Sequence, residues 1–386
     1  MSPQPLLVFG PRSTDYDFGP QHPLTPRRFG PGIDLLREVG AEPGLAPEPA
    51  SDDELLACHE PAYVAAVKRI SDIAGESGWA EPEIGIAAGD NPAFFGMHEA
   101  AAAVAGGSLR AMEAILSADV EHAFHPGGGL HHATPGRASG FCIYNDPAIA
   151  IARARRDGLR VLYVDLDVHH GDAVEAIHRD DPGVLTVSFH ETTRYLFPYL
   201  GGGLDDVGSG AARGTVVNVP LPPETGGEAW LSAVTGLVPD LAAAFRPDVL
   251  VSQHGADSHA WDPLAHLRNT TTSMGAAARL VHDLAHEHAD GRWLATGGGG
   301  YDAYRVVPRS WSLVWLAAAH REIPGETPPT WRERWTAEAT QYGQAPLPTT
   351  FDDPSTETES ASVTLIERTV DHVRATVLPL LEAAPQ

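Results

Sequence analysis

Residues 160–178 read RVLYVDLDVHHGDAVEAIH and contain the most informative pattern of the chain. Its first half alternates as a β-strand does, with an apolar face made of Leu162, Val164, Leu166 and Val168. The other face carries Val161, Tyr163, Asp165, Asp167 and His169. The last three of these can bind a metal ion. A strand this apolar should be buried, and a buried carboxylate is costly unless it is paired with a charge or bound to a cation.

Asp165 and Asp167 have a simpler interpretation, as partners in ordinary ion pairs. That interpretation needs a Lys or Arg nearby, and the flanking Arg160 lies before the strand, at the wrong end. A metal site therefore deserves a search for further ligands elsewhere in the chain.

The composition is that of a large, acidic, globular protein. The chain has 386 residues, 43% of them hydrophobic, and a formal net charge of -25. This net charge argues against a nucleic-acid partner, because phosphate binding needs clustered Lys and Arg, and Lys68 is the only lysine. The negative charge would attract cationic substrates, but it is also a common means of keeping a cytoplasmic protein in solution.

Cys58 and Cys142 are the only cysteines, too few for a disulfide framework or a cysteine-based zinc site. The first residues, MSPQPLLVFGPRST, contain neither a basic region nor a long apolar run. We therefore expect a cytoplasmic protein with no secretory signal and no membrane partner.

The pattern of apolar residues predicts an α/β fold with three layers, α/β/α, around a mainly parallel sheet. Strands are expected at residues 6–9, 120–124, 161–168, 184–189, 216–219, 248–252 and 293–296. Helices are expected near residues 33–39 and at 52–70, 97–116, 147–156, 173–178, 229–245, 273–288 and 309–320. This alternation assigns residues 1–322 to one catalytic domain.

The remaining residues, 323–386, read as an appendage. A proline-rich connector, anchored by Trp331 and Trp335, leads to a helix predicted at residues 363–381. That helix can pack on the domain or on a partner subunit, so an oligomer is one outcome.

Polar clusters follow four of the expected strands, at the carboxyl ends where α/β folds carry their working groups. His131 and His132 follow the strand at 120–124, Asp257 follows that at 248–252, and Tyr301 follows that at 293–296. Together with Asp167 and His169, Asp257 offers two carboxylates and one imidazole, the donor set of a catalytic metal site with open positions.

The paired histidines need partners if they act in proton transfer. Each can hydrogen-bond a carboxylate through one ring nitrogen, and Asp165 and Asp172 are available. Tyr301 follows four glycines whose spacing fits neither phosphate-binding motif. We favour a tight turn that aims its hydroxyl at the metal site, with a buried structural tyrosine as the alternative.

These motifs resemble the class I histone-deacetylase family, most closely its bacterial acetoin-utilisation branch. The resemblance spans roughly residues 9–320 and is carried by GGGLHHA (127–133), GFCIYNDPAIAI (140–151), VLYVDLDVHHGD (161–172), QHGADSH (253–259) and GGGGYD (297–302). It implies the arginase/deacetylase fold and a hydrolase that removes acetyl groups from lysine side chains of proteins, a metabolic enzyme being one such substrate.

The resemblance also implies individual roles. Zn²⁺, with Fe²⁺ as the alternative, would be held by Asp167, His169 and Asp257. His132 would be the general base and acid with Asp172 behind it, His131 and Asp165 would assist, and Tyr301 would polarise the acyl carbonyl. The implied substrate channel comprises Asp90, Gly140, Phe141, Phe197 and Leu264. A structural K⁺ would bind to Asp165, to Ser188 and to the carbonyls of Asp167, His169 and Phe189, and Arg28 would lie in a cavity below the metal.

One segment departs from the family. Residues 197–201 read FPYLG where the family has F-P-G-T-G, which changes the rim of the channel. Three other functions remain. A two-manganese ureohydrolase needs carboxylates where this chain has Gly171 and His259. An acetylpolyamine amidohydrolase shares the chemistry but takes a small cationic substrate. A scaffold on an inactive fold would be expected to lack a catalytic group, and none is missing.

Overall fold

The computed structural model describes residues 4–77, 80–87 and 89–383 and contains one eight-stranded sheet. The strand order is β2-β1-β3-β8-β7-β4-β5-β6, and neighbouring strands pair in parallel throughout. The strands are β1 (Leu6–Val8), β2 (Pro43–Leu45), β3 (His122–His125), β4 (Val161–Asp165), β5 (Val184–Glu191), β6 (Val216–Leu221), β7 (Val249–Gln253) and β8 (Trp293–Thr296). Because all carboxyl ends lie at one edge, the polar clusters that follow the strands meet there.

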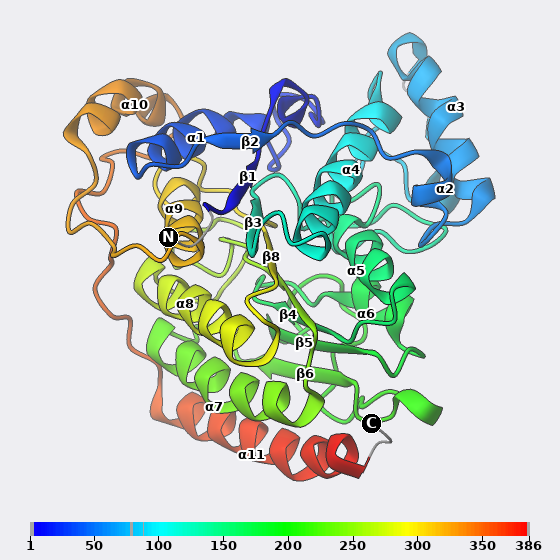
Figure 1. Ribbon diagram of the computed structural model, residues 1–386. Helices are drawn as coiled ribbons and strands as arrows, with labels where there is room; N and C mark the ends of the chain where they lie inside the picture. Colours follow the sequence, from blue (N-terminus) through cyan, green and yellow to red (C-terminus); the bar gives the residue numbers. More distant parts are fainter. Residues whose placement is uncertain (1–3, 78–79, 88, 384–386) are drawn as a thin grey trace.

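Helices cover both faces of the sheet, which confirms the three-layer prediction (Figure 1). One face is covered by α1 (Phe29–Glu38), α7 (Gly227–Phe245), α8 (Thr271–His288) and α9 (Val307–Ala318). The other is covered by α4 (Met97–Leu116), α5 (Asp146–Arg156) and α6 (Asp172–His178). The short α2 (Asp52–Leu55) and α3 (Pro61–Ser77) lie beside α4. One helix predicted at residues 52–70 is thus two helices, because Pro61 starts the second.

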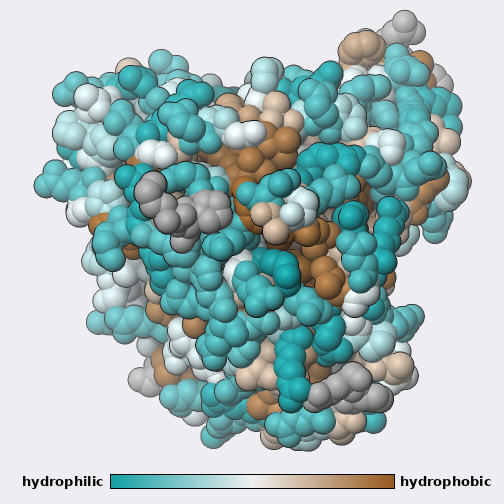
Figure 2. All heavy atoms as spheres, in the orientation of Figure 1, coloured by the Kyte–Doolittle hydropathy of each residue, from teal (hydrophilic) through white to brown (hydrophobic). Residues whose placement is uncertain are grey.

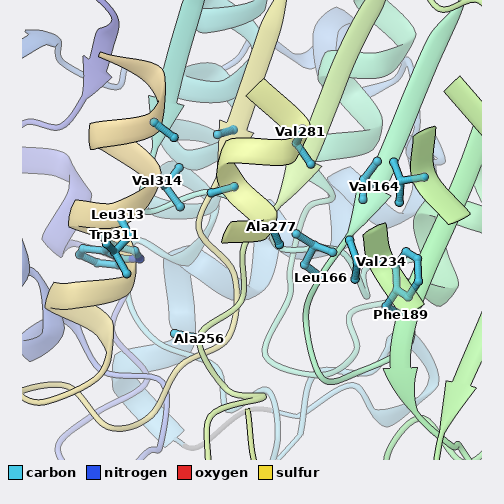
Figure 3. Packing of buried hydrophobic residues seen from close by; sticks show 14 of the residues in the cluster. Val164, Leu166, Phe189, Val234, Ala256, Ala277, Val281, Trp311, Leu313 and Val314 are labelled. Atoms are coloured by element: carbon cyan, nitrogen blue, oxygen red, sulfur yellow. The ribbon is translucent and has the colours of Figure 1, made fainter. Parts of the chain in front are cut away.

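Strand β4 sends its side chains alternately into the two cores. Leu162 and Val164 lie in the core beneath α7, α8 and α9, while Val161 and Tyr163 lie in the core beneath α4 and α5. Figure 3 shows the first of these cores, with side chains of α8 between those of α9 and those of β4. Every strand residue of β4 is buried, as its apolar sequence predicts.

The structure ends β4 at Asp165, three residues earlier than predicted. The Leu166 N–H still donates to the Gln253 carbonyl of β7, at 2.9 Å. The next two N–H groups donate instead to carboxylates, those of Asp165 (3.2 Å) and Asp257 (3.0 Å). Side chains of the site therefore replace a neighbouring strand as hydrogen-bond partners, and the chain turns away from the sheet.

The segment after residue 322 packs on the sheet domain. The region expected to be a connector contains helix α10 (Pro329–Gln341), whose Trp331 is fully buried and donates to the Pro31 carbonyl at 2.9 Å. The last helix, α11 (Ser360–Ala383), lies along α7 and beside β6 (Figure 1). Its buried residues Ile366, Val370, Val373 and Val377 have the helical spacing on which its prediction rested. The division of the chain at residue 322 itself stays a prediction.

The surface in Figure 2 is mostly hydrophilic, with apolar residues gathered in limited areas. None of the helices in the described ranges combines the length and the apolar character that crossing a lipid bilayer requires.

Asp353 ties the C-terminal segment to the domain. Its carboxylate accepts hydrogen bonds from Arg309 Nη1 (2.7 Å), Thr271 Oγ1 (2.8 Å) and His259 Nε2 (2.8 Å). Burial alone would raise the pKa of this carboxyl, but the bonds from His259 and Arg309 outweigh it and hold the pKa well below its usual range. Because Arg309 is fully buried, loss of the carboxylate would leave an uncompensated charge.

We therefore expect Asp353→Asn to lower the free energy of unfolding by about 3 kcal/mol at pH 7. Urea unfolding measures the change, and Asp352→Asn is the matched control, since Asp352 is exposed. The group has a depressed pKa when folded, so its contribution should stay constant above pH of about 4 and be lost as the pH falls further. Equal unfolding energies for the two variants would contradict the assignment.

Candidate active site

A cavity of about 250 Å³ opens at the carboxyl edge of the sheet. All five residues predicted for a substrate channel line it: Asp90, Gly140, Phe141, Phe197 and Leu264. His132, His169 and Tyr301 also line it, together with Leu196 and Tyr199. A smaller cavity continues inward past His131, Asp167 and Gly299. The structure thus brings the predicted channel and the predicted site chemistry into one pocket.

The three predicted metal ligands form a compact cluster. His169 Nδ1 lies 3.0 Å from Asp167 Oδ1 and 3.1 Å from Asp257 Oδ2, and all three side chains are buried. The three donor atoms lie within 4.8 Å of one another. Burial and the charge of Asp167 raise the pKa of Asp257 to about 6. A cation at this point would remove the repulsion between the two carboxylates.

Glycines make room for these carboxylates. A Cβ on Gly255 would lie 2.0 Å from Asp167 Oδ2, and one on Gly299 would lie 1.9 Å from Asp257 Oδ2. The Gly299 N–H donates to Asp167 Oδ2 at 2.9 Å, and Gln253 Nε2 donates to the same oxygen at 2.6 Å. The glycine-rich turn before Tyr301 therefore lets a backbone N–H reach the metal ligands.

His131 and His132 each bind one of the two predicted carboxylates. His131 Nδ1 lies 2.7 Å from Asp165 Oδ2, and His132 Nδ1 lies 2.7 Å from Asp172 Oδ1. The two Nε2 atoms are 3.0 Å apart. If each Nδ1 donates to its carboxylate, the hydrogen bond between the two Nε2 atoms requires that one of them carries a proton and that the other accepts the hydrogen bond. The pair then holds one imidazolium and one neutral imidazole.

The electrostatic surroundings decide which ring is charged. Burial disfavours the charge on His131, but Asp165 and Asp167 outweigh that effect and raise its pKa to about 9. Burial and the adjacent His131 lower the pKa of His132 to about 4, although Asp172 opposes them. His131 is therefore the cation, and His132 is the neutral ring whose Nε2 lone pair accepts the hydrogen bond from His131.

Tyr301 lines both cavities, and its ring meets that of Phe141 edge-on, with centroids 5.9 Å apart. Its backbone is fixed by Asp262, whose carboxylate accepts from the Tyr301 N–H at 2.8 Å. Burial and the charges of Asp257 and Asp167 raise the pKa of Tyr301 well above its ordinary value. The hydroxyl therefore keeps its proton and remains a hydrogen-bond donor.

The mouth of the cavity has an unusual backbone. Phe141 has a positive φ of 68°, and a Cβ on the preceding Gly140 would lie 2.4 Å from the His132 ring. The rings of Phe197 and His132 are edge-on at 4.9 Å. Tyr199, in the segment that departs from the family pattern, is 64% exposed and has a φ of 61°. A large side chain thus lies in the cavity lining at a position where the family pattern has glycine.

Several residues that support the site were not predicted. Asp146 accepts from the Gly129 and Leu130 N–H groups, at 3.0 Å and 2.8 Å, and so holds the loop before the histidines. Tyr163 donates to Asp165 Oδ2 at 2.7 Å. Their positions in the sequence could have identified these supporting residues, because Tyr163, Gln253 and Asp146 are polar residues inside the motifs that carry the family resemblance.

Two further predictions concern residues below the site. Asp165 and Ser188 are partners in the β4–β5 register, and Phe189 follows in β5, so the side chains and strand predicted for K⁺ are adjacent. Arg28 is buried, donates to the Gly298 carbonyl at 2.7 Å and lines a small cavity with Leu130. Arg28 thus lines a small cavity behind the glycine-rich turn, and its place below a metal ion stays a prediction.

Comparison with known proteins shows the family of this chain. The family model for the histone deacetylase domain matches residues 22–318. Acetoin utilization protein AcuC of Bacillus subtilis is 41% identical over 355 residues, which are 91% of this chain and 90% of that protein. AcuC of Staphylococcus xylosus is 36% identical over 353 residues, 90% of each chain.

Solved structures have the same fold. A crystal structure of an HDAC homologue from Aquifex aeolicus superimposes with a TM-score of 0.83 at 26% identity, covering 95% of this chain and all of that one. A structure of an HDAC homologue complexed with SAHA gives the same TM-score and covers 96% of this chain. The chain therefore belongs to the histone deacetylase family, in its bacterial acetoin-utilisation branch, and is a deacetylase hydrolase with the fold of that family.

Proposed function

We propose that this protein hydrolyses the amide bond of N-acetyl-lysine side chains in cytoplasmic proteins, with Zn²⁺ as its ion and Fe²⁺ as the alternative. One observation carries the proposal: three potential metal ligands, two His–Asp pairs and a tyrosine meet at the floor of one cavity. Amide hydrolysis needs a group that moves protons and donors that stabilise an oxyanion. A metabolic enzyme is the kind of acetylated partner we expect.

Asp167, His169 and Asp257 fit a divalent ion. Two carboxylates and an imidazole are donors that suit Zn²⁺, and three protein ligands leave positions open for water and substrate, as catalytic sites do. A bound ion would supply a Lewis acid for the acyl carbonyl and lower the pKa of water to about 7. K⁺ beside Asp165 and Ser188 would hold the strand end that carries two of these ligands.

His132 would take a proton from the attacking water and return it to the departing lysine amine. Asp172 supports this role because it accepts from His132 Nδ1, so the lone pair of this ring lies on Nε2, which faces His131 Nε2 at 3.0 Å. The His132 side chain lines the cavity. His131, charged and paired with Asp165, would stabilise negative charge that develops nearby. The Tyr301 hydroxyl would donate to the oxyanion formed from the acyl oxygen.

The cavity favours an acyl-lysine side chain over a bulkier group. Phe141 and Phe197 flank it, so an unbranched methylene stem would contact two aromatic rings. Asp90 is exposed and would accept hydrogen bonds from the N–H groups of the substrate backbone. We assign the activity to residues 1–322, since every residue with a role in this account precedes that point.

Tyr301→Phe should lower kcat about 10²- to 10³-fold with little change in KM, because it removes a donor used only in the transition state. Steady-state kinetics on an acetyl-lysine peptide measures the effect. Tyr195→Phe is the control, since Tyr195 is exposed and outside the cavity lining. Turnover near that of the wild type would remove the proposed role of Tyr301.

His132→Ala should reduce kcat further than Tyr301→Phe while the metal content stays at one equivalent in the catalytic cluster. His169→Ala should lose both activity and that equivalent, because His169 would be a ligand. Metal analysis of the two purified variants separates the roles. Loss of metal from His132→Ala would mean that base and ligand are misassigned.

A substrate panel tests the substrate class. We expect kcat/KM for an acetyl-lysine peptide to exceed that for acetylspermidine at least tenfold, since the rim offers Asp90 to a peptide backbone. A reversed ratio would identify an acetylpolyamine amidohydrolase, to which the net charge of -25 is also suited. If the zinc-loaded protein hydrolyses neither substrate, the proposed function is wrong.

A further inference from the structure

Four histidines gather at the amino-terminal edge of the sheet, opposite the proposed catalytic site. His122 begins β3, His282 and His286 lie in α8, and His320 follows α9. Each offers one ring nitrogen, and these four nitrogens lie within 4.8 Å of one another. Amide hydrolysis uses none of them. We propose that they bind a structural divalent metal ion of the kind that prefers tetrahedral nitrogen coordination, with Zn²⁺ as the probe.

The arrangement of the rings is tetrahedral. The six centroid separations among the four imidazoles all fall between 4.6 and 5.3 Å. Four points with nearly equal separations mark the corners of a tetrahedron. Metal–nitrogen bonds of about 2.0–2.1 Å place four imidazole centroids roughly 5 Å apart around a tetrahedral ion. The rings thus already have the spacing that such an ion requires.

The nitrogen atoms support the same conclusion. His122 Nε2 and His286 Nε2 are 3.1 Å apart, close to the roughly 3.3 Å between neighbouring nitrogens of a tetrahedral site. His282 Nε2 is buried and has no hydrogen-bond partner in the part of the chain that the structure describes. A buried imidazole nitrogen with no partner is costly, and a metal ion would satisfy it.

The outer contacts are those of a metal-binding histidine. His282 Nδ1 lies 2.8 Å from the Asp283 carboxylate, so that Nδ1 donates and Nε2 keeps its lone pair for the ion. Carboxylates in this position orient zinc-binding histidines in many proteins.

Two helix ends add a favourable field. His286 is in the last turn of α8, and His320 lies two residues beyond the end of α9, so the negative ends of both helix dipoles face the cluster. His320 has a φ of 54°, in the position of the α9 cap where glycine is usual. A histidine accepts this strained position and completes the set of four. His286 and His320 are exposed, which gives an ion access from solvent.

Such an ion would join three elements that are distant in sequence. It would fix the carboxyl ends of α8 and α9 to the start of β3, next to the point where α8 leads into β8 (Figure 1). Four protein ligands leave no open position, which is the pattern of a structural site. The inference is independent of the proposed function, because none of its ligands touches the catalytic cavity.

The test counts metal equivalents in the untagged full-length protein, stripped of metal and dialysed against Zn²⁺. We expect two equivalents in the wild type and one in the double variant H286Q/H320Q, with normal deacetylase activity. H288Q is the matched control, since His288 lies on the same helix outside the cluster, and it should keep two equivalents. Co²⁺ added in place of Zn²⁺ should give the visible spectrum of a tetrahedral site in the wild type and H288Q.

A variant without the catalytic cluster distinguishes metal binding at the four histidines from metal binding at the catalytic site. D167N/D257N lacks both carboxylates of the catalytic cluster and should still bind one equivalent, which H286Q/H320Q should abolish in that background. Zn²⁺ should also raise the melting temperature of D167N/D257N more than that of the combined variant. If D167N/D257N binds no Zn²⁺, or if H286Q/H320Q removes none, the proposed site does not exist, whatever the outcome for the catalytic ion.

Discussion

The site depends on two buried carboxylates, those of Asp167 and Asp257, which lie close together. Asp167 follows β4 and Asp257 follows β7, and adjacent parallel strands deliver both side chains to one edge of the sheet. Neither burial nor mutual repulsion is tolerable without compensation, and burial together with Asp167 raises the pKa of Asp257 to about 6. Backbone N–H groups, Gln253 and His169 relieve part of the cost. A divalent cation would offset the remaining cost of burying these two negative charges side by side.

The same constraint explains the rest of the pocket. A cation held at the end of a sheet is accessible only through the loops above it, so the channel consists of loop residues such as Phe141, Phe197 and Asp90. The histidine pair lies beside the cluster, where Asp165 and Asp167 keep His131 charged and His131 in turn keeps His132 neutral. The buried carboxylates of Asp165 and Asp167 therefore determine that His131 is an imidazolium and that His132 is a neutral imidazole.

Much of this could be predicted from sequence because strand alternation and strand ends are local signals. Val161 and Leu162 face different cores, and the polar residues after four strands converge, as parallel topology requires. What could not be predicted depends on contacts distant in sequence. β2 has only three residues and no alternation, α10 lies within a proline-rich segment, and β4 ends early because carboxylates capture its N–H groups. The histidine cluster comes from three separate segments.

Anomalous diffraction at the zinc edge, from crystals of the zinc-loaded protein, would locate the ion directly. We predict a peak about 2.0–2.2 Å from donor atoms of Asp167, His169 and Asp257, at the floor of the channel. If the protein hydrolyses acetyl-lysine but gives no peak among these three side chains, they do not hold the catalytic ion.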